Sequence, residues 1–199
     1  MIIDYTKGYE EAINRGILYL QINPLYDKPH IRLNEKVNKI EGITFLNFPL
    51  LEGEELSLIG CSFENCGKVV LNDCEMEYCI FGCVDSLDFD DCTVENSKFL
   101  KLYAEAGEII TLTDSRISHC VFNDIVLNAD NDWEEETYLC IGTGDSCIDF
   151  CSFSNIQMDS EGCELFHYEL PKKILRKKNV ATSFVNIETC SGLDEVISV

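Results

Sequence analysis

Apolar and small residues recur along most of the chain at gaps of two and three positions. In the stretch CEMEYCIFGC, residues 74–83, they fall at Cys74, Met76, Cys79 and Phe81. A gap of two is typical of a strand whose alternate side chains face inward, and a gap of three marks a corner between strands. An amphipathic helix would instead show gaps of three and four. The pattern therefore predicts short strands separated by regular corners.

The same pattern returns every eighteen residues. The unit that begins at Cys74 recurs at this step in units that begin at Leu20, Asn38, Leu56 and Cys92. Longer steps of 23 and 36 residues lead to units that begin at Ser115 and Cys151. A fixed period is the signature of a repeat architecture in which each unit stacks on the next.

The repeat predicts an all-β fold, a parallel β-helix (β-solenoid) of about seven coils stacked ~4.8 Å apart. We expect one domain over residues 1–199. Residues 1–19 would form an N-terminal cap with a short helix within Tyr5–Arg15, and residues 20–166 the solenoid. Residues 167–199 would form an irregular C-terminal cap or tail.

Two coils carry extra residues, Tyr103–Gly107 and Asn128–Ser146. We treat the longer one, residues 128–146, as an insertion into the solenoid. Because both segments enter at the same corner, we expect them to form one raised surface. Loops added on one face of a repeat scaffold often form its binding face.

Five-residue units such as LSLIG, CSFEN, CEMEY and CVFND resemble the pentapeptide-repeat family. In that family a small residue and a Leu or Phe point inward, and polar residues point outward. The resemblance covers residues 56–158 and implies a right-handed quadrilateral helix, while a triangular parallel β-helix fits eighteen-residue coils equally well. Proteins similar to this family include inhibitors of topoisomerases that mimic DNA. The resemblance therefore implies inhibition of a nucleic-acid enzyme by DNA mimicry.

The twelve cysteines fall mostly on the inward columns. A buried thiol is a small and nearly apolar filler, and no paired C-x-x-C knuckles suggest a zinc site. Core packing is therefore favoured over a metal site or a redox pair, and we expect no metal and no cofactor. Met1–Asp4 has no basic region of the kind that begins a signal peptide, so we expect none, and the apolar run Gly16–Ile22 is too short to cross a membrane. We expect a cytoplasmic protein with reduced thiols.

The chain carries 36 acidic and 15 basic residues, a formal net charge of −21. Such a charge repels nucleic acid and anionic membranes and attracts basic partners. Matched outward positions should stack one row of acids along a corner, and these are Glu55, Asp73, Asp91 and Asp114. Glu77 and Glu95 would form a second short row.

The insertion contains the only tryptophan of the chain among acids. Trp133 is a candidate binding anchor, and its neighbours Asp130, Asp132, Glu134 and Glu135 would add charge. Calcium binding is an alternative for this loop, but the turn glycine and the distal glutamate of an EF-hand are missing. Trp133 could also fold back onto the coil.

Two interpretations of the charge compete. The acids could simply keep the exterior solvated, or they could fit a basic groove of a nucleic-acid-processing enzyme and stand in for its nucleic acid. The second interpretation predicts a non-enzymatic inhibitor, of the anti-restriction, anti-CRISPR or gyrase-protection type.

Two alternatives remain. An immunity protein that neutralises a basic toxin would rely on the same physics. A polysaccharide-active β-helix enzyme would use paired carboxylates such as Asp88 and Asp90.

Overall fold

The computed structural model describes residues 1–21, 30–104, 106–128, 136–158, 162–169, 184–185, 189–193 and 197–198. Strands dominate these residues, and the helical elements among them are short: η1 (Tyr5–Lys7), α1 (Glu10–Asn14) and η2 (Glu35–Val37). No helix among the described residues is both long and apolar enough to cross a membrane. The expectation of an all-β fold is confirmed.

The strands form three sheets, here named A, B and C. Sheet A contains β1 (Ile2–Asp4), β5 (Thr44–Leu46), β8 (Ser62–Glu64), β11 (Ile80–Gly82), β14 (Lys98–Leu100), β18 (Val121–Leu127), β21 (Ser152–Met158) and β23 (Ile197–Ser198), and β15 (Tyr103–Ala104) pairs with β18. Sheet B contains β2 (Leu18–Gln21), β3 (His30–Leu33), β6 (Leu50–Glu54), β9 (Lys68–Asn72), β12 (Ser86–Asp90), β16 (Gly107–Thr113), β19 (Thr137–Thr143) and β22 (Cys163–Glu169). Sheet C contains β4 (Lys39–Glu41), β7 (Ser57–Ile59), β10 (Glu75–Glu77), β13 (Thr93–Glu95), β17 (Arg116–Ser118) and β20 (Cys147–Asp149).

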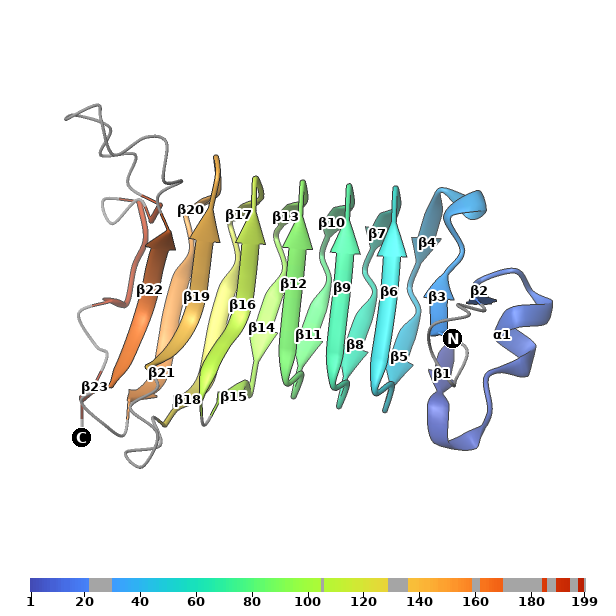
Figure 1. The fold of residues 1–199 in the computed structure, drawn as a ribbon, viewed down its shortest axis with the longest axis horizontal. Helices are drawn as coiled ribbons and strands as arrows, with labels where there is room; N and C mark the ends of the chain where they lie inside the picture. The colour runs from blue at the N-terminus through green and yellow to red at the C-terminus, as the bar shows by residue number, and fades with distance from the viewer. Residues whose placement is uncertain are drawn as a thin grey trace.

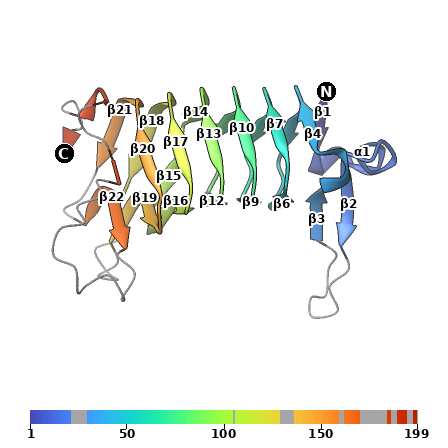
Figure 2. The same cartoon turned by 90° about the horizontal axis from the view of Figure 1, so that it is seen from above.

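From β6 to β21 the chain passes through sheets B, C and A in turn and then begins again (Figures 1 and 2). Neighbouring strands within each sheet are parallel, except β2 and β3 of sheet B. Met76 lies between Leu58 and Val94 in sheet C, and Phe81 lies beside Phe63 in sheet A. Each of these steps is eighteen residues, so the predicted period is the true register of the sheets.

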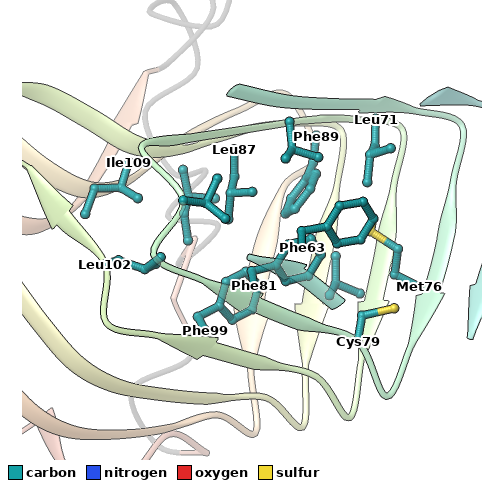
Figure 3. Close-up of a cluster of buried hydrophobic side chains, with 14 of the residues drawn as sticks. Phe63, Leu71, Met76, Cys79, Phe81, Leu87, Phe89, Phe99, Leu102 and Ile109 are labelled. Carbon is teal, nitrogen blue, oxygen red and sulfur yellow. The ribbon is translucent and has the colours of Figure 1, made fainter. Parts of the chain in front are cut away.

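The inward side chains of all three sheets belong to one buried cluster (Figure 3). Six phenylalanines of sheet A stack face to face in successive turns, with ring centroids 4.5–5.3 Å apart: Phe45, Phe63, Phe81, Phe99, Phe122 and Phe153. Each ring is at most 2% exposed. Stacked aromatic pairs add ~0.5–1.5 kcal/mol beyond the area that they bury. The ladder therefore reinforces the register that the strand hydrogen bonds set.

From β6 to β17, a residue with positive φ stands at the connections between sheets. In one turn of the chain these are Asp73, Tyr78 and Cys83, with φ of 49°, 56° and 51°. This left-handed region costs most L-residues energy, whereas Gly, Asn and Asp tolerate it best. Asn and Gly accordingly occupy many equivalent corners: Gly42, Asn47, Gly60, Asn65, Asn96 and Asn155.

The buried cysteines do more than fill space. The backbone N–H of Cys79 donates to the Ser97 hydroxyl in the next turn at 2.9 Å, and the N–H of Ser97 donates to the Cys120 sulfur at 3.4 Å. At this corner the backbone N–H of one turn therefore donates a hydrogen bond to a side chain of the next turn. All twelve cysteines are free thiols, and burial raises the pKa of the Cys66 thiol to about 11, so that it stays neutral. The prediction that the inward-column thiols pack in the core is confirmed, and the column also accepts hydrogen bonds.

The predicted first coil, from Leu20, is wrong. Leu20 lies in β2, which pairs antiparallel with β3, so that Leu20 faces Ile31 and is 42% exposed. An antiparallel hairpin has the same alternation of two as a parallel strand, and spacing alone could not separate them. The remainder of that unit lies in residues 22–29, outside the described residues.

The helix expected within Tyr5–Arg15 divides into η1 and α1, separated by Gly8 with φ of 105°. Ala12 is buried, and Tyr9 and Ile13 pack against the core cluster. The residues expected on the inner face of the helix are therefore the ones that contact the core.

The predicted step of 36 residues near the C-terminal end is also wrong. Phe122 pairs with Phe153 and Ile117 with Ile148, a step of 31. Because the pattern within a turn nearly repeats every five residues, a shift of five preserves most of it. The predicted insertion 128–146 is likewise too long, since β19 occupies residues 137–143 of it as a strand of sheet B. Only residues 128–136 lie between β18 and β19.

Residues near the C-terminus extend two of the sheets. Val185 forms a parallel bridge with Ile148 of sheet C, and Ser191 forms one with Ser152 of sheet A. The N–H of Ile148 donates to the carbonyl of Phe184 at 2.7 Å. These pairs continue the stacking beyond the last complete turn.

Candidate functional site

The four acids predicted to stack do lie one above another at the corner between sheets B and C. The N–H of Glu55 donates to the carbonyl of Asn72 at 3.0 Å, and that of Asp73 donates to Asp90 at 2.9 Å. The N–H of Asp91 donates to Thr113 at 2.9 Å. All four side chains, those of Glu55, Asp73, Asp91 and Asp114, are exposed. We call this set the B–C corner row.

The backbone of this corner gives one reason for its aspartates. The four residues have φ between 46° and 53°, a region that Asp enters more readily than Glu. The Asp114 carboxylate also accepts the N–H of Asp145 at 2.8 Å. Asp73, Asp91 and Asp114 therefore suit the turn as well as adding charge, whereas Glu55 adds charge without that backbone advantage.

Asp90 lies beside this row at the outer end of β12. Burial raises the pKa of its carboxyl, and the negative charges of Asp91, Asp114, Asp73 and Asp88 raise it further. Repulsion between the acids of the corner thus adds to the effect of burial on this carboxyl.

Asp88, which the enzyme alternative paired with Asp90, has a different environment. It forms an ion pair with Lys68 at 3.2 Å. The Asp88 carboxylate is thus paired with a lysine, whereas the Asp90 carboxylate lies among other acids.

The outer face of sheet C carries a second group of acids around a shallow groove of about 370 Å³. Glu75, Glu77 and Glu95 line it together with Ser57 and Thr93. Glu77 and Glu95 are direct neighbours in register, and like charges in that position are destabilising. The predicted short row of Glu77 and Glu95 is therefore present. Glu75 and the groove were missed, although Glu75 stands at an outward position of the same strand.

The bases of sheet C lie at its two ends. Lys39 pairs with Glu41 in β4, and Arg116 pairs with Asp149 at 2.9 Å near the other end. On sheet B, Arg32 and Lys68 pair with Glu54 and Asp88. Among the described residues, no ion pair reaches the groove glutamates Glu75, Glu77 and Glu95, or Asp73 and Asp91 of the corner row. Unpaired acids therefore follow one another on the middle of sheet C and the B–C corner, while other described acids without an ion pair, such as Glu64, Asp85 and Asp124, lie elsewhere on the surface.

The corner on the other side of sheet C carries exposed rings. Tyr78 is 59% and Phe150 51% exposed, and the His119 ring stacks on Phe150 with centroids 5.0 Å apart. The hydrogen bond between Tyr78 and Glu77 raises the pKa of the tyrosine hydroxyl. The sequence analysis did not select these residues, because nothing in their spacing distinguishes them from the asparagine and glycine at equivalent corners.

The predicted loop site, Asp130, Asp132, Trp133, Glu134 and Glu135, lies outside the described residues. Its binding role stays a prediction. Within the ranges that the structure does describe, no group of three or more His, Cys, Asp or Glu side chains is arranged to hold a metal ion.

Neither a scan against protein-family models nor a search of curated proteins found a match to this chain. The resemblance to pentapeptide repeats therefore stays an expectation from the repeat units alone. Any function has to be argued from the charges and the shape of the surface.

Proposed function

We propose that this chain is one right-handed β-solenoid that acts in the cytoplasm as a non-enzymatic, acidic binding protein. It inhibits a partner by covering a basic surface on which that partner would otherwise hold nucleic acid. The observation that carries the proposal is the stack of unneutralised acids along sheet C and the B–C corner row. The free thiols of all twelve cysteines are consistent with a reducing compartment.

The density of charge supports the comparison with nucleic acid. One turn of the chain places Asp73, Glu75 and Glu77 on this side, and the next places Asp91 and Glu95 there. With turns ~4.8 Å apart, these two turns carry one charge per roughly 1.6–2.4 Å, and the turns on either side add one acid each, Glu55 and Asp114. Double-stranded DNA carries about one charge per 1.7 Å of its axis. A groove that binds a duplex would meet a similar charge density here.

The cost of the arrangement also supports a binding role. Glu77 stands directly beside Glu95, and burial together with the charges of the neighbouring acids raises the pKa of Asp90. Stacked like charges lower stability, and proteins retain such features where function requires them. A solvated exterior alone would be served equally well by alternating signs of charge.

The enzyme alternative has less support. Asp88 is held by Lys68, and the groove on sheet C contains neither Asp88 nor Asp90. A pair of carboxylates needs a substrate-sized site between them for glycosidic chemistry. The immunity-protein alternative relies on the same acidic surface and differs only in the identity of the basic partner.

Inhibition of nucleic-acid-binding enzymes tests the proposal. A panel of a type II topoisomerase, restriction endonucleases and basic nucleases would be assayed for DNA binding with the protein added, at salt from about 50 to 500 mM. We expect at least one enzyme to lose DNA binding at low salt and to recover it as salt rises. Inhibition of none of the panel at low salt, or inhibition that salt does not change, would contradict the proposal.

A further inference from the structure

The corner between sheets C and A places bulky rings where the backbone favours small residues. The equivalent positions in successive turns are Gly42, Gly60, Tyr78, Asn96, His119 and Phe150. Tyr78, His119 and Phe150 have φ of 56°, 55° and 54°. The same corner forms with glycine in two turns, so the fold does not need an aromatic side chain there. Large side chains in this region are outliers that point to a use outside the fold.

The rings are available for contact. Tyr78 and Phe150 are more than half exposed, and the His119 side chain is exposed as well. Exposed aromatic residues are frequent anchors of protein interfaces, and their faces attract the guanidinium group of arginine. Tyr78 follows Glu77 directly, so its ring borders the acidic groove of sheet C.

The negative charge of the groove favours the binding of cationic groups. Among the described residues no ion pair reaches Glu75, Glu77 or Glu95, and Ser57 and Thr93 add only neutral hydroxyls. The B–C corner row borders one edge of the same sheet, and at the other edge Tyr78 lies beside the groove between Gly60 and Asn96, with His119 and Phe150 in the following turns. The outer face of sheet C is therefore acidic, with the B–C corner row along one edge and the Tyr78 ring at the other.

The spacing of the turns selects the form of the partner. The groove crosses three turns, β7, β10 and β13, which are ~4.8 Å apart. An α-helix repeats a face every ~5.4 Å, whereas alternate residues of an extended strand are ~6.7 Å apart. The glutamates lie in two of these turns, Glu75 and Glu77 on β10 and Glu95 on β13, and over this one step the mismatch is about 0.6 Å for a helix and about 1.9 Å for a strand. Arginines on one face of a helix would stay opposite the successive acids.

We propose that the outer face of sheet C docks a basic α-helix of a protein partner, with the helix parallel to the stack of turns. Its arginines lie over Glu75, Glu77 and Glu95, and one guanidinium stacks on the Tyr78 ring. This inference rests on the proposed function, because it names the surface that meets the basic partner.

The test uses two synthetic peptides of about sixteen residues, long enough for helix formation. One carries arginines at i, i+4, i+7 and i+11, and the other has the same composition with its arginines spread around the helix. Binding to the full chain is measured by fluorescence anisotropy at about 50 mM salt. We expect the first peptide to bind at least about fivefold more tightly than the second.

Three variants locate the surface. Glu75→Gln, Glu77→Gln and Glu95→Gln together should weaken binding of the first peptide by about tenfold or more. Tyr78→Gly should weaken it by about three- to tenfold, and its thermal stability should not fall, because glycine suits the corner. Glu64→Gln on sheet A is the matched control and should change binding by less than about twofold.

The outcomes separate the two proposals. If the triple glutamine variant binds the first peptide as tightly as the unaltered chain, or both peptides bind equally, the docking surface is wrong while the acidic binding function stands. If the unaltered chain binds neither peptide at low salt and inhibits no enzyme of the panel, both proposals fail.

Discussion

Two corners of this fold each place a residue in the left-handed region of φ, and they use different types of side chain there. At the corner between sheets A and B, the left-handed position is occupied in successive turns by Asn47, Asn65, Cys83, Lys101, Asp124 and Asn155. At the B–C corner the equivalent residues are Glu55, Asp73, Asp91 and Asp114. Asparagine serves this conformation as well as aspartate does. The acids of the B–C corner are therefore not required by the turn, and their charge needs a separate explanation.

The two sheets next to these corners differ in the same way. The outer face of sheet A carries residues such as Ser62, Ile80 and Lys98, and only Glu64 supplies a negative charge at its centre. The outer face of sheet C carries Glu75, Glu77 and Glu95 at the matching turns. Inside, both sheets stack apolar side chains in the same register. The apolar inner faces of sheets A and C are therefore alike, whereas the outer face of sheet C carries more negative charge than that of sheet A.

The largest expected effect concerns the inner face of sheet A. Phe81→Ala removes a ring that stacks on Phe63 and Phe99, and should lower the free energy of unfolding by about 3–5 kcal/mol. Val94→Ala, on the inner face of sheet C, removes two methyl groups and should lower it by about 1.5–3 kcal/mol. Urea unfolding measures both. An equal loss for the two variants would show that the phenylalanine ladder has no special weight.

The next effect tests the hydrogen-bonded column. Ser97→Ala leaves the buried N–H of Cys79 without its acceptor and should lower the free energy of unfolding by about 1–3 kcal/mol. Ser97→Cys is the matched control. It should change the free energy by less than about 1 kcal/mol, because Cys61, Cys79, Cys120 and Cys151 occupy equivalent positions. If Ser97→Ala is as stable as Ser97→Cys, the column serves only to fill space.

The comparison of the two corners can be inverted by mutation. Asp73→Asn with Asp91→Asn keeps the backbone preference, removes two stacked charges and should raise the free energy of unfolding by roughly 0.2–1 kcal/mol. Asn47→Asp with Asn65→Asp adds a charged pair to the A–B corner and should lower it by a larger amount, because Asn47 also loses its hydrogen bond to the Asp4 carboxylate. Chemical unfolding at low salt measures both changes, and about 500 mM salt should reduce them. Loss of stability in the first variant would mean that these aspartates are needed for the turn itself.

The smallest effect is the pH dependence that Asp90 contributes. Its pKa in the folded protein is raised above the ordinary value of 3.8, so the folded chain holds this proton more tightly than the unfolded chain. Stability from this group is therefore present at pH below 3.8, falls as pH rises through the window just above it, and stays reduced at neutral pH. Asp90→Asn should raise stability at pH 7 and leave it nearly unchanged near pH 3.

Asp88→Asn is the control for this measurement, because it removes the ion pair with Lys68. It should lower stability slightly at pH 7, by roughly 0–1 kcal/mol. If Asp90→Asn gave no gain at pH 7, the acids at this corner would not repel one another appreciably.

The register of the central turns followed from the sequence, because inward Phe, Cys and Leu recur at a fixed step from Asn38 to Phe99. The prediction failed at both ends, for different reasons. At Leu20 an antiparallel hairpin imitates the alternation of a parallel strand. At Cys151 the true step between turns is 31 residues, and the predicted step was 36. The two differ by five residues, and the pattern within a turn nearly repeats every five residues, so it could not separate them.

The acidic row of the site was predictable, and its aromatic edge was not. Glu55, Asp73, Asp91 and Asp114 hold matched outward positions, so their stacking follows from the period alone. Tyr78, His119 and Phe150 become unusual only once their φ values are known. A sequence pattern carries no such information, because the same position accepts glycine, asparagine and aromatic residues.

We infer that the acids of sheet C and the B–C corner form the surface that meets a basic partner. Backbone amide chemical shifts, followed by NMR as the arginine-faced peptide is added at low salt, test it most directly. We expect the largest changes at residues 73–78 and 91–96, and small changes at residues 62–65 and 98–101 of the sheet A side. Changes concentrated on the sheet A side, or spread evenly over both sides, would contradict the account.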